Sequence, residues 1–361
     1  MKRMCRCRSV FTRVVPAVLA LAVAACATAP SGQPHVHDLP KTVTFAGEPV
    51  PVDDPEVYER VSTWYNLYLS QPWHASRWLE RAEQVFPIIE PILEEHDLPE
   101  DLKYVAVLES SLDPRAIGEA GERGIWQFMP DTAEEFDLTM NRFVDERSDI
   151  AASTQAAAEY FRESREEISG SWNLAVASFN VGVDGVTART ARQGEKDYWS
   201  MVFPPVTEDY LPKAIAAKLL MENASAFDIG PQVSHPEIRA FSVTLEETPL
   251  YLVDIAERID VRFRQLWRAN PHIWKPYLEP GEYTIYLPED AAGDMSGEAL
   301  ETFLRDQPYE KRSLSADGER TIAEIADERG VTADELATFN DVSTGYTPEE
   351  DEEIVYWHRG E

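Results

Sequence analysis

The spacing of apolar side chains changes once along this chain, at Gly230-Pro231, and the change limits what each part can fold into. Residues 55–225 repeat apolar side chains three and four positions apart, the spacing of amphipathic helices, without sustained two-residue alternation. Beyond the change, residues 239–245 alternate as a half-buried strand does. We therefore expect a mainly α protein, in which an all-α region precedes smaller α+β units.

Several helices are expected in the first region. They cover residues 55–71, 75–96, 98–111, 149–168, 172–180, 183–193 and 207–225. Leu98-Pro99 suits the start of a helix, because proline fits the first turn, where its missing N–H is not needed. Pro87 and Pro91 lie inside the second helix, so we expect a kink or a break near residues 86–91.

Two small units with the same order of elements follow. Each reads strand, helix, helix, strand, at residues 239–245, 250–259, 261–267 and 283–287 and again at residues 312–314, 321–329, 332–340 and 353–357. A unit that occurs twice indicates a repeat. We place the units at residues 237–290 and 312–361, with an acidic linker at 291–311 that is expected to be partly helical.

The start of the chain has the composition of a targeting segment. Residues 1–25 combine a basic beginning with an apolar run that is too short to span a bilayer comfortably. The run ends in Val23-Ala24-Ala25-Cys26, which resembles the lipobox of bacterial lipoproteins. The resemblance implies that residues 1–25 are a signal peptide and that Cys26 is lipidated and anchors the chain in a membrane. An ordinary signal peptide with an incidental cysteine is the alternative.

Two further expectations follow from the lipobox resemblance and the composition beyond it. Ala27, directly after the cysteine, favours the periplasmic face of the outer membrane. Residues 26–52 lean towards Pro, Gly, Ser, Thr and His and are expected to form a flexible tether.

Cysteine and histidine offer little for metal chemistry in this sequence. Cys5 and Cys7 leave with the signal peptide, so the mature chain has no thiol for a disulfide, a nucleophile or a metal. His35 and His37 lie in the tether without a nearby cysteine, and we predict no metal site.

The net charge is strongly negative. Thirty-three Lys and Arg residues stand against 65 Asp and Glu residues, which gives −32. Such a field repels polyphosphates, so nucleic acid is not an expected partner. We interpret the charge as a solubilising surface.

Glu109 is the first candidate for chemistry. It lies at the C-terminal end of an apolar helix, where burial disfavours the charged carboxylate and raises its pKa. A carboxyl group that keeps its proton near neutral pH suits a general acid for a leaving glycosidic oxygen. Ser110 could orient this carboxyl group by a hydrogen bond.

The loop that follows adds candidate binding residues. Gln127 offers a donor and an acceptor that suit N-acetyl or hydroxyl groups. Trp126, Phe128 and Met129 could form apolar walls for sugar rings. The alternative is that these three apolar side chains belong to the core.

Three blocks of residues resemble the lysozyme-like domain of lytic murein transglycosylases. They are Glu109-Ser110 with Pro114 and Ala116, Gly124-Ile125-Trp126-Gln127-Phe128-Met129-Pro130, and Ala177-Ser178-Phe179-Asn180-Val181-Gly182. Residues 145–175 and 208–213 are similar to the membrane-bound lytic murein transglycosylase D branch. The resemblance implies a lysozyme-like all-α catalytic domain at residues 53–230.

The resemblance also implies a reaction. Glu109 would protonate the bond between MurNAc and GlcNAc in peptidoglycan and would then, as a carboxylate, take the proton of the MurNAc 6-hydroxyl. That hydroxyl closes a 1,6-anhydro ring, assisted by the N-acetyl group. Most glycosidases need two carboxylates, but here the substrate itself supplies the nucleophile. No cofactor is implied.

Roles for the neighbouring residues come from the same resemblance. Ser110 would orient Glu109, and Tyr210 would bond to Glu109 or to the substrate acetamido group. Gln127 and Asn180 would contact the sugar. The family's tyrosine is replaced here by Phe179, so the task of its hydroxyl is lost or is taken over, for example by Ser178.

The two C-terminal units resemble LysM modules, which bind GlcNAc-containing glycans. The last unit is the better match by sequence, although it lacks the Pro-Gly that the first keeps as Pro280-Gly281. The first unit is interpreted as a degenerate copy. A spacer without sugar affinity is the alternative for both.

Two other functions remain open on the sequence. A hydrolytic muramidase of the same fold would need a second acid, for which Asp113, Glu119 and Glu122 are the nearby candidates. A non-catalytic peptidoglycan-binding scaffold is the other alternative. The expected partners are peptidoglycan glycan strands and, through the lipid anchor, the membrane; the sequence identifies no protein partner.

Overall fold

The computed structural model describes residues 36–168 and 170–360. The predicted signal peptide, the lipidation site Cys26, Ala27 and His35 lie outside the described residues. No helix within the described ranges combines the length and the apolar character that crossing a bilayer requires.

A short hairpin begins the folded part. Strands β1 (Val43–Phe45) and β2 (Glu48–Val50) pair antiparallel, and Val43, Phe45 and Val50 are buried in the same core as the helices that follow. The Glu48 carboxylate accepts a hydrogen bond from the Trp172 backbone N–H at 2.6 Å, at the start of a later helix. The expected tether over residues 26–52 is therefore wrong for the hairpin, because its apolar side chains pack although its composition is that of a spacer.

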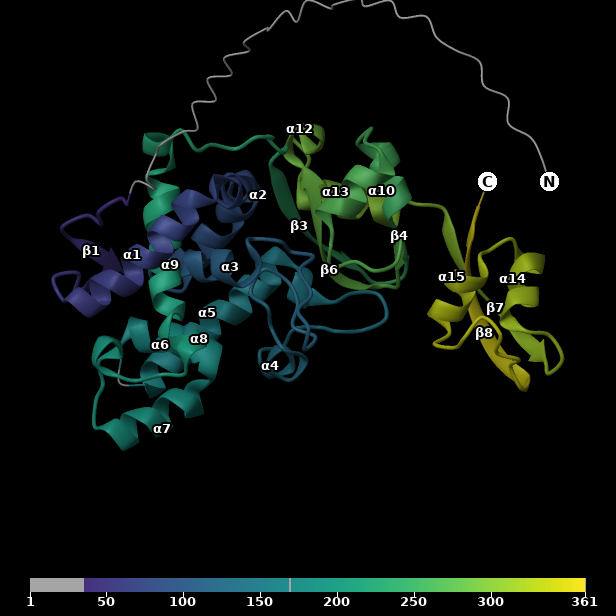
Figure 1. The fold of residues 1–361 in the computed structure, drawn as a ribbon. Helices are drawn as coiled ribbons and strands as arrows, with labels where there is room; N and C mark the ends of the chain where they lie inside the picture. The colour runs from purple at the N-terminus through teal and green to yellow at the C-terminus, as the bar shows by residue number, and fades with distance from the viewer. Residues whose placement is uncertain (1–35, 169, 361) are drawn as a thin grey trace, which may run out of the picture. The chain divides into compact units, whose positions relative to one another are not determined.

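The helices of the first region form where the apolar spacing predicts them. Figure 1 shows how they are arranged. They are α1 (Pro55–Ser70), α2 (Pro72–Glu95), α3 (Lys103–Ser110), α5 (Ile150–Glu167), α6 (Trp172–Val181), α7 (Val183–Gln193) and α9 (Tyr210–Glu222), with the short helices α4 (Pro130–Glu135) and α8 (Pro205–Glu208). Short 3-10 turns lie at Glu100–Leu102, Glu146–Ser148, Tyr198–Ser200 and Ala224–Phe227. One hydrophobic core connects α1, α2, α3, α5, α6 and α9.

Helix α2 continues through both of its interior prolines, so the predicted break near residues 86–91 is wrong. Pro87 and Pro91 are exposed and lie one turn apart on the solvent side. The carbonyl groups that lose their N–H partners there can bind water. The opposite side of the helix packs Val85 and Ile89 into the core.

The first C-terminal unit has the predicted order of elements. Strands β3 (Ile238–Leu245) and β6 (Gly281–Pro288) pair antiparallel. Between them in the chain lie helices α10 (Leu252–Arg258) and α11 (Phe263–Ala269). The short strands β4 (Leu250–Tyr251) and β5 (Tyr277–Leu278) form a second antiparallel pair. Phe241 and Ile285 face each other across β3 and β6 in the buried core of the unit.

The second unit repeats this arrangement. It consists of β7 (Tyr309–Asp317), α14 (Ile322–Arg329), α15 (Ala333–Phe339) and β8 (Glu350–Arg359). Strands β7 and β8 pair antiparallel, with Ser313 opposite Val355. The unit has a small core of its own around Ile325 and Leu336.

The segment 291–311, predicted as an acidic linker, belongs to the first unit. It contains the end of α12 (Glu289–Ala292) and helix α13 (Gly297–Arg305), which packs on β3. Leu300 and Leu304 are buried in the core of the first unit. The expected helical character is present, but the few apolar residues on one side of the helix are enough to make it part of the unit.

In each unit, an asparagine after the second helix joins that helix to the last strand by side-chain hydrogen bonds, an arrangement called here the asparagine bracket. The Asn270 side chain donates to the carbonyls of Leu266 at 2.8 Å and Tyr286 at 2.9 Å and accepts from the Tyr286 N–H at 2.7 Å. In the second unit the Asn340 side chain makes the equivalent bonds to Leu336 and Val355, at 2.7, 2.7 and 2.8 Å. This shared bracket between helix and strand supports a structural repeat.

The first unit is built into the helical region. Phe143 and Val144, from the loop before α5, belong to the core of the unit. In return Tyr286 of β6 is buried in the helical core, where its hydroxyl donates to Asp149 at 2.6 Å. Asp149 also caps the N-terminus of α5. Burial of Tyr286 therefore joins the strand to the start of a helix in the first region.

Replacement of Asn270 by alanine tests the bracket. Asn270 is fully buried, and its loss leaves a backbone N–H and two carbonyls without their partner. We expect Asn270→Ala to lower the free energy of unfolding in urea by about 3 kcal/mol and the half-buried Asn340→Ala by about 1 kcal/mol. The exposed Asn223→Ala, which loses one helical hydrogen bond, is the control. Equal, small effects for Asn270 and Asn223 would contradict this role.

Candidate active site

Glu109 occupies the last turn of α3. Most of that helix is buried, and it ends at Ser111, whose φ of 55° turns the chain away. The helix therefore carries Glu109 to the edge of the core, where its side chain is half-buried. The hydroxyl of Tyr210 donates a hydrogen bond to Oε1 of Glu109.

The environment of Glu109 favours its protonated form. Burial raises the pKa of Glu109 to about 7 from its ordinary value of 4.5. The hydrogen bond from Tyr210 acts in the opposite direction, and the negative charge of Glu122 adds to the increase. The carboxyl group therefore exchanges its proton near neutral pH, as an acid that must also act as a base requires.

Tyr210 is held in place as a hydrogen-bond donor. It is the first residue of α9 and is buried. Burial and the neighbouring Glu109 carboxylate raise the pKa of Tyr210 well above its ordinary value. The phenol therefore keeps its proton, and it stabilises the ionised form of Glu109 whenever that form arises.

Ser110 acts on the backbone and not on the carboxyl group. Its hydroxyl donates to the carbonyls of Ile125 at 2.9 Å and Ala106 at 3.2 Å and accepts from the Asp113 N–H. Among the described hydrogen bonds, none joins Ser110 to Glu109, so the expected direct orientation is not seen. Ser110 instead fastens the end of α3 to the loop that carries Gln127.

A buried ion cluster shapes that loop. Asp145, almost fully buried, forms two hydrogen bonds with Arg147 at 2.9 and 2.7 Å and an ion pair with Arg123. Arg147 also donates to the carbonyls of Gly121 and Phe128. The cluster therefore fixes both ends of residues 121–128.

Gly124 is the one position in the loop where glycine is needed for two reasons. Its φ of +82° lies in the left-handed region that side chains rarely adopt. A Cβ at this position would also lie 1.6 Å from the carbonyl oxygen of Arg147. The close approach lets the loop pack against the 3-10 turn at Glu146–Ser148.

A cavity of about 510 Å³ brings several of the predicted binding residues together. Its wall contains Gln127, Phe128, Met129 and Asn180. The other lining residues are Thr132, Glu135, Tyr160, Glu167, Ser178, Phe179, Gly182, Val183 and Asp184. The cavity therefore has aromatic and amide groups that suit sugar rings, together with several carboxylates.

The two amide side chains of the cavity are held differently. Gln127 has a positive φ of 52°, and its Nε2 donates to the carbonyl of Gly124 at 2.7 Å. Asn180 is exposed near the end of α6, and its Oδ1 accepts from the Thr207 hydroxyl at 2.7 Å. Thr207, which the sequence analysis missed, thus orients the Asn180 amide.

Tyr160 is the residue that sequence reasoning missed in this cavity. The Phe179 ring packs 5.1 Å from the Tyr160 ring and stacks on Phe161, inside an aromatic cluster. Ser178 is fully buried, and its hydroxyl donates to the Ala175 carbonyl at 2.7 Å, so it does not replace the missing hydroxyl of the family's tyrosine. Tyr160 carries a hydroxyl in the cavity wall, where it donates to the Ser178 carbonyl.

Tyr160 also connects the cavity with the acid. Its phenol lies close enough to Tyr210 for their charges to interact, and Tyr210 in turn binds Glu109. The order Tyr160, Tyr210, Glu109 leads from the cavity wall to the carboxyl group. Tyr160 lies in the segment 145–175 that the family resemblance covers, but no role in the site was assigned to it from the sequence.

The candidate second acids differ in their surroundings. Asp113 forms an ion pair with Arg81 at 2.5 Å. Glu119 is exposed. Glu122 is close enough for its charge to raise the pKa of Glu109, and its carboxylate accepts from the Ala120 N–H at 3.0 Å. No group of three or more His, Cys, Asp or Glu side chains that could hold a metal occurs within residues 36–168 and 170–360.

Comparisons with known proteins agree with this arrangement. The model of the transglycosylase SLT domain matches residues 86–202, and that of the LysM domain matches residues 251–282. The LysM match falls on the first of the two C-terminal units.

Two individual proteins are similar to the chain. Membrane-bound lytic murein transglycosylase D of Escherichia coli (strain K12) is 26% identical over 310 residues, which cover 82% of this chain and 68% of that protein. The X-ray structure of an inactive mutant of the lytic transglycosylase Slt from Pseudomonas aeruginosa covers 40% of this chain and 24% of its own, at 15% identity and a TM-score of 0.31.

The SLT match contains Glu109 and the loop with Gln127, and the LysM match lies in the first C-terminal unit. The relation to the Escherichia coli protein extends over both. The chain therefore carries a transglycosylase SLT domain followed by a LysM domain, and it is similar over most of its length to a lytic murein transglycosylase.

Proposed function

We propose that the protein cleaves the β-1,4 bond between MurNAc and GlcNAc in peptidoglycan and releases 1,6-anhydro-MurNAc ends. The observation that carries the proposal is Glu109, a half-buried carboxyl group with a pKa of about 7 beside a donor that cannot easily ionise. The cavity with Gln127 and Asn180 supports a sugar substrate.

The reaction needs one carboxyl group in two protonation states. Glu109 first gives its proton to the glycosidic oxygen, and the bond from that oxygen to C1 of MurNAc breaks with assistance from the N-acetyl group. The Glu109 carboxylate then takes the proton of the 6-hydroxyl, whose oxygen bonds to C1. Glu109 ends protonated, and no water is consumed.

The remaining residues would hold the substrate and the acid. Tyr210 stabilises the carboxylate between the two steps, and Gln127 and Asn180 bind acetamido or hydroxyl groups. Phe128 and Met129 give apolar walls, of which Met129 is exposed. A hydrolytic muramidase would instead need a base that positions water. Arg81 neutralises one candidate for that task, Asp113.

The domains suggest how the enzyme reaches its substrate. The SLT and LysM domains both imply peptidoglycan binding. The second unit, residues 309–360, is proposed as a further LysM-like module because it shares the strand order and the asparagine bracket of the first. Anchoring by Cys26 to the periplasmic face of the outer membrane is part of the proposal.

Removal of the acid is the direct test. We expect Glu109→Gln to release soluble fragments from purified sacculi at least about 100-fold more slowly than the unsubstituted protein. The side-chain amide of glutamine cannot transfer a proton to the glycosidic oxygen. Mass spectrometry of the fragments should show anhydro ends. The control is Glu166→Gln, an exposed acid on α5. Reducing ends, or undiminished activity of Glu109→Gln, would reject the proposal.

Folding of Glu109→Gln is checked separately. The pKa of Glu109 is raised in the folded state, so ionisation of this group costs stability as the pH rises from about 4.5 through about 7. The variant should therefore be at least as resistant to heat as the unsubstituted protein at pH 8. Loss of activity without loss of stability then assigns the effect to chemistry.

The pH dependence tests the role of Tyr210. Activity that needs protonated Glu109 should fall as the pH rises through about 7. Tyr210→Phe removes the hydrogen bond that lowers the pKa of Glu109, so the alkaline limb should move to higher pH and the maximal rate should fall. Tyr58→Phe, which loses an exposed hydrogen bond to Asp38, is the control. An alkaline limb that stays in place would contradict this assignment.

A further inference from the structure

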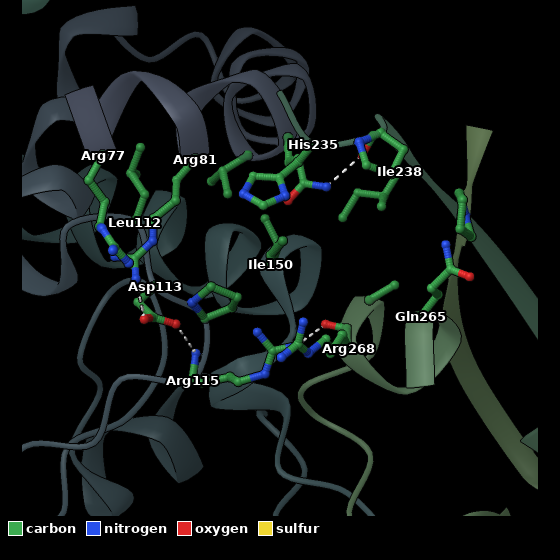
Figure 2. Close-up of a pocket in the computed structure, with 16 residues that line it drawn as sticks. Arg77, Arg81, Leu112, Asp113, Arg115, Ile150, His235, Ile238, Gln265 and Arg268 are labelled. Atoms are coloured by element: carbon green, nitrogen blue, oxygen red, sulfur yellow. Dashed lines mark hydrogen bonds and ion pairs between the residues drawn. The ribbon is translucent and has the colours of Figure 1, made fainter. Parts of the chain in front are cut away.

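A second cavity, of about 470 Å³, lies where the SLT domain meets the LysM domain (Figure 2). One side is formed by α2 with Arg77 and Arg81 and by the loop after α3 with Asp113 and Arg115. The other side is formed by α11 with Arg268 and by residues 235–238. None of the residues assigned to the sugar cleavage lines it.

The charge of this cavity is opposite to that of the protein. The chain as a whole has 65 acidic residues against 33 basic ones. The wall of this cavity has four arginines against one carboxylate, Asp113. Neighbouring Glu80 does not line the cavity, and its carboxylate accepts from the backbone N–H groups of Gln232 and Val233. An excess of positive charge is therefore concentrated here.

Two of the arginines have polar partners. Arg81 donates to the Ser111 carbonyl at 2.8 Å and forms the ion pair with Asp113, which lies between Arg81 and Arg115 in Figure 2. Arg115 donates to the backbone carbonyl of Arg268. Within residues 36–168 and 170–360, no carboxylate forms an ion pair with Arg77 or Arg268.

The arginines are held close together against their mutual repulsion. Burial lowers the pKa of Arg81, the charge of Asp113 opposes this decrease, and the charge of Arg77 adds to it. Burial likewise lowers the pKa of Arg115; Asp113 opposes that decrease, and the charges of Arg268 and Arg81 add to it. A bound anion would relieve both the repulsion and the missing counter-charge.

Hydrogen bonds join the elements that carry the cavity wall. Gln84 of α2 donates to the Pro236 carbonyl at 2.5 Å, which ties the connecting segment to α2. The buried Tyr286–Asp149 hydrogen bond joins β6 to the start of α5. These contacts hold the backbone on both sides of the cavity, while the side chains of Arg77 and Arg268 are exposed and accessible to a ligand.

We propose that this cavity binds a carboxylate of the peptide that is attached to MurNAc. Arginine guanidinium groups bind carboxylates through two parallel hydrogen bonds. The inference rests on the proposed function, because peptidoglycan stem peptides carry carboxylates. The cavity is also close to the acid along the chain. Its residues Leu112–Arg115 follow Glu109 and Ser110 within a few positions, so a peptide bound here contacts the loop that begins just after Glu109.

The LysM domain would then take part in binding the stem peptide. Arg268 and Gln265 on α11 belong to that domain and line the cavity together with the SLT residues. The preferred substrate class is therefore a glycan strand with stem peptides whose carboxylates are free, in preference to a strand stripped of peptide or one with amidated peptides.

Peptide binding is measured without glycan, so the result does not depend on the cleavage reaction. Calorimetry with the Glu109→Gln protein would use three probes: the free stem tetrapeptide, the same peptide with its carboxylates amidated, and inorganic phosphate. Arg77→Gln/Arg268→Gln removes the two arginines without a carboxylate partner. Arg162→Gln/Arg264→Gln, exposed arginines outside the cavity wall, changes the net charge equally.

We expect the tetrapeptide to bind, the first double variant to weaken binding at least about 10-fold, and the control double variant to leave it within about twofold. Amidation should weaken binding as much as the first double variant does. Heat stability of both variants is compared with that of the parent. No binding of the tetrapeptide, equal binding by both double variants, or tighter binding of phosphate than of the tetrapeptide would each overturn the proposal.

Discussion

Partial burial of one carboxyl group is the constraint on which the site depends. Glu109 lies at the end of a buried helix, and the loss of water around it raises its pKa to about 7. The hydrogen bond from Tyr210 lowers the pKa of Glu109 and so limits this increase. The balance of the two effects produces a group that can give and take a proton.

The surrounding structure keeps this balance fixed. Ser110 ties the end of α3 to the backbone of Ile125, and Arg147 ties the following loop to the 3-10 turn before α5. Asp149 then joins the start of α5 to Tyr286 of the LysM domain. Polar contacts therefore hold the segments between α3 and the first C-terminal unit in place at several points.

Much of the fold could be predicted from the sequence because the apolar spacing is regular. The helices of residues 55–225 and the strands of both small units occur where the spacing indicates them. Two errors arose where composition was used without spacing. The hairpin at Val43–Val50 has the composition of a tether, and the segment of α13 has that of a linker, although both bury apolar side chains. The break expected in α2 does not occur, because Pro87 and Pro91 lie on its exposed side.

The site was predictable in part. Glu109 and its neighbour Tyr210, 101 positions apart, come together as the family resemblance implies. The hydroxyl of Tyr160 beside Phe179, the support of Asn180 by Thr207 and the attachment of Ser110 to the backbone depend on how helices pack against one another. Local sequence carries no signal for such contacts. The four arginines likewise come from separate segments that meet only in the fold.

Direct titration of Glu109 tests the central claim. The measurement is an NMR pH titration of the protein with ¹³C-labelled glutamate side chains, in which the Glu109 signal is identified by its absence from Glu109→Gln. We predict that the titration of the Glu109 carboxyl group has its midpoint near pH 7. A midpoint near 4.5, the ordinary value for glutamate, would show that the group is already ionised at neutral pH and would contradict its role as the acid.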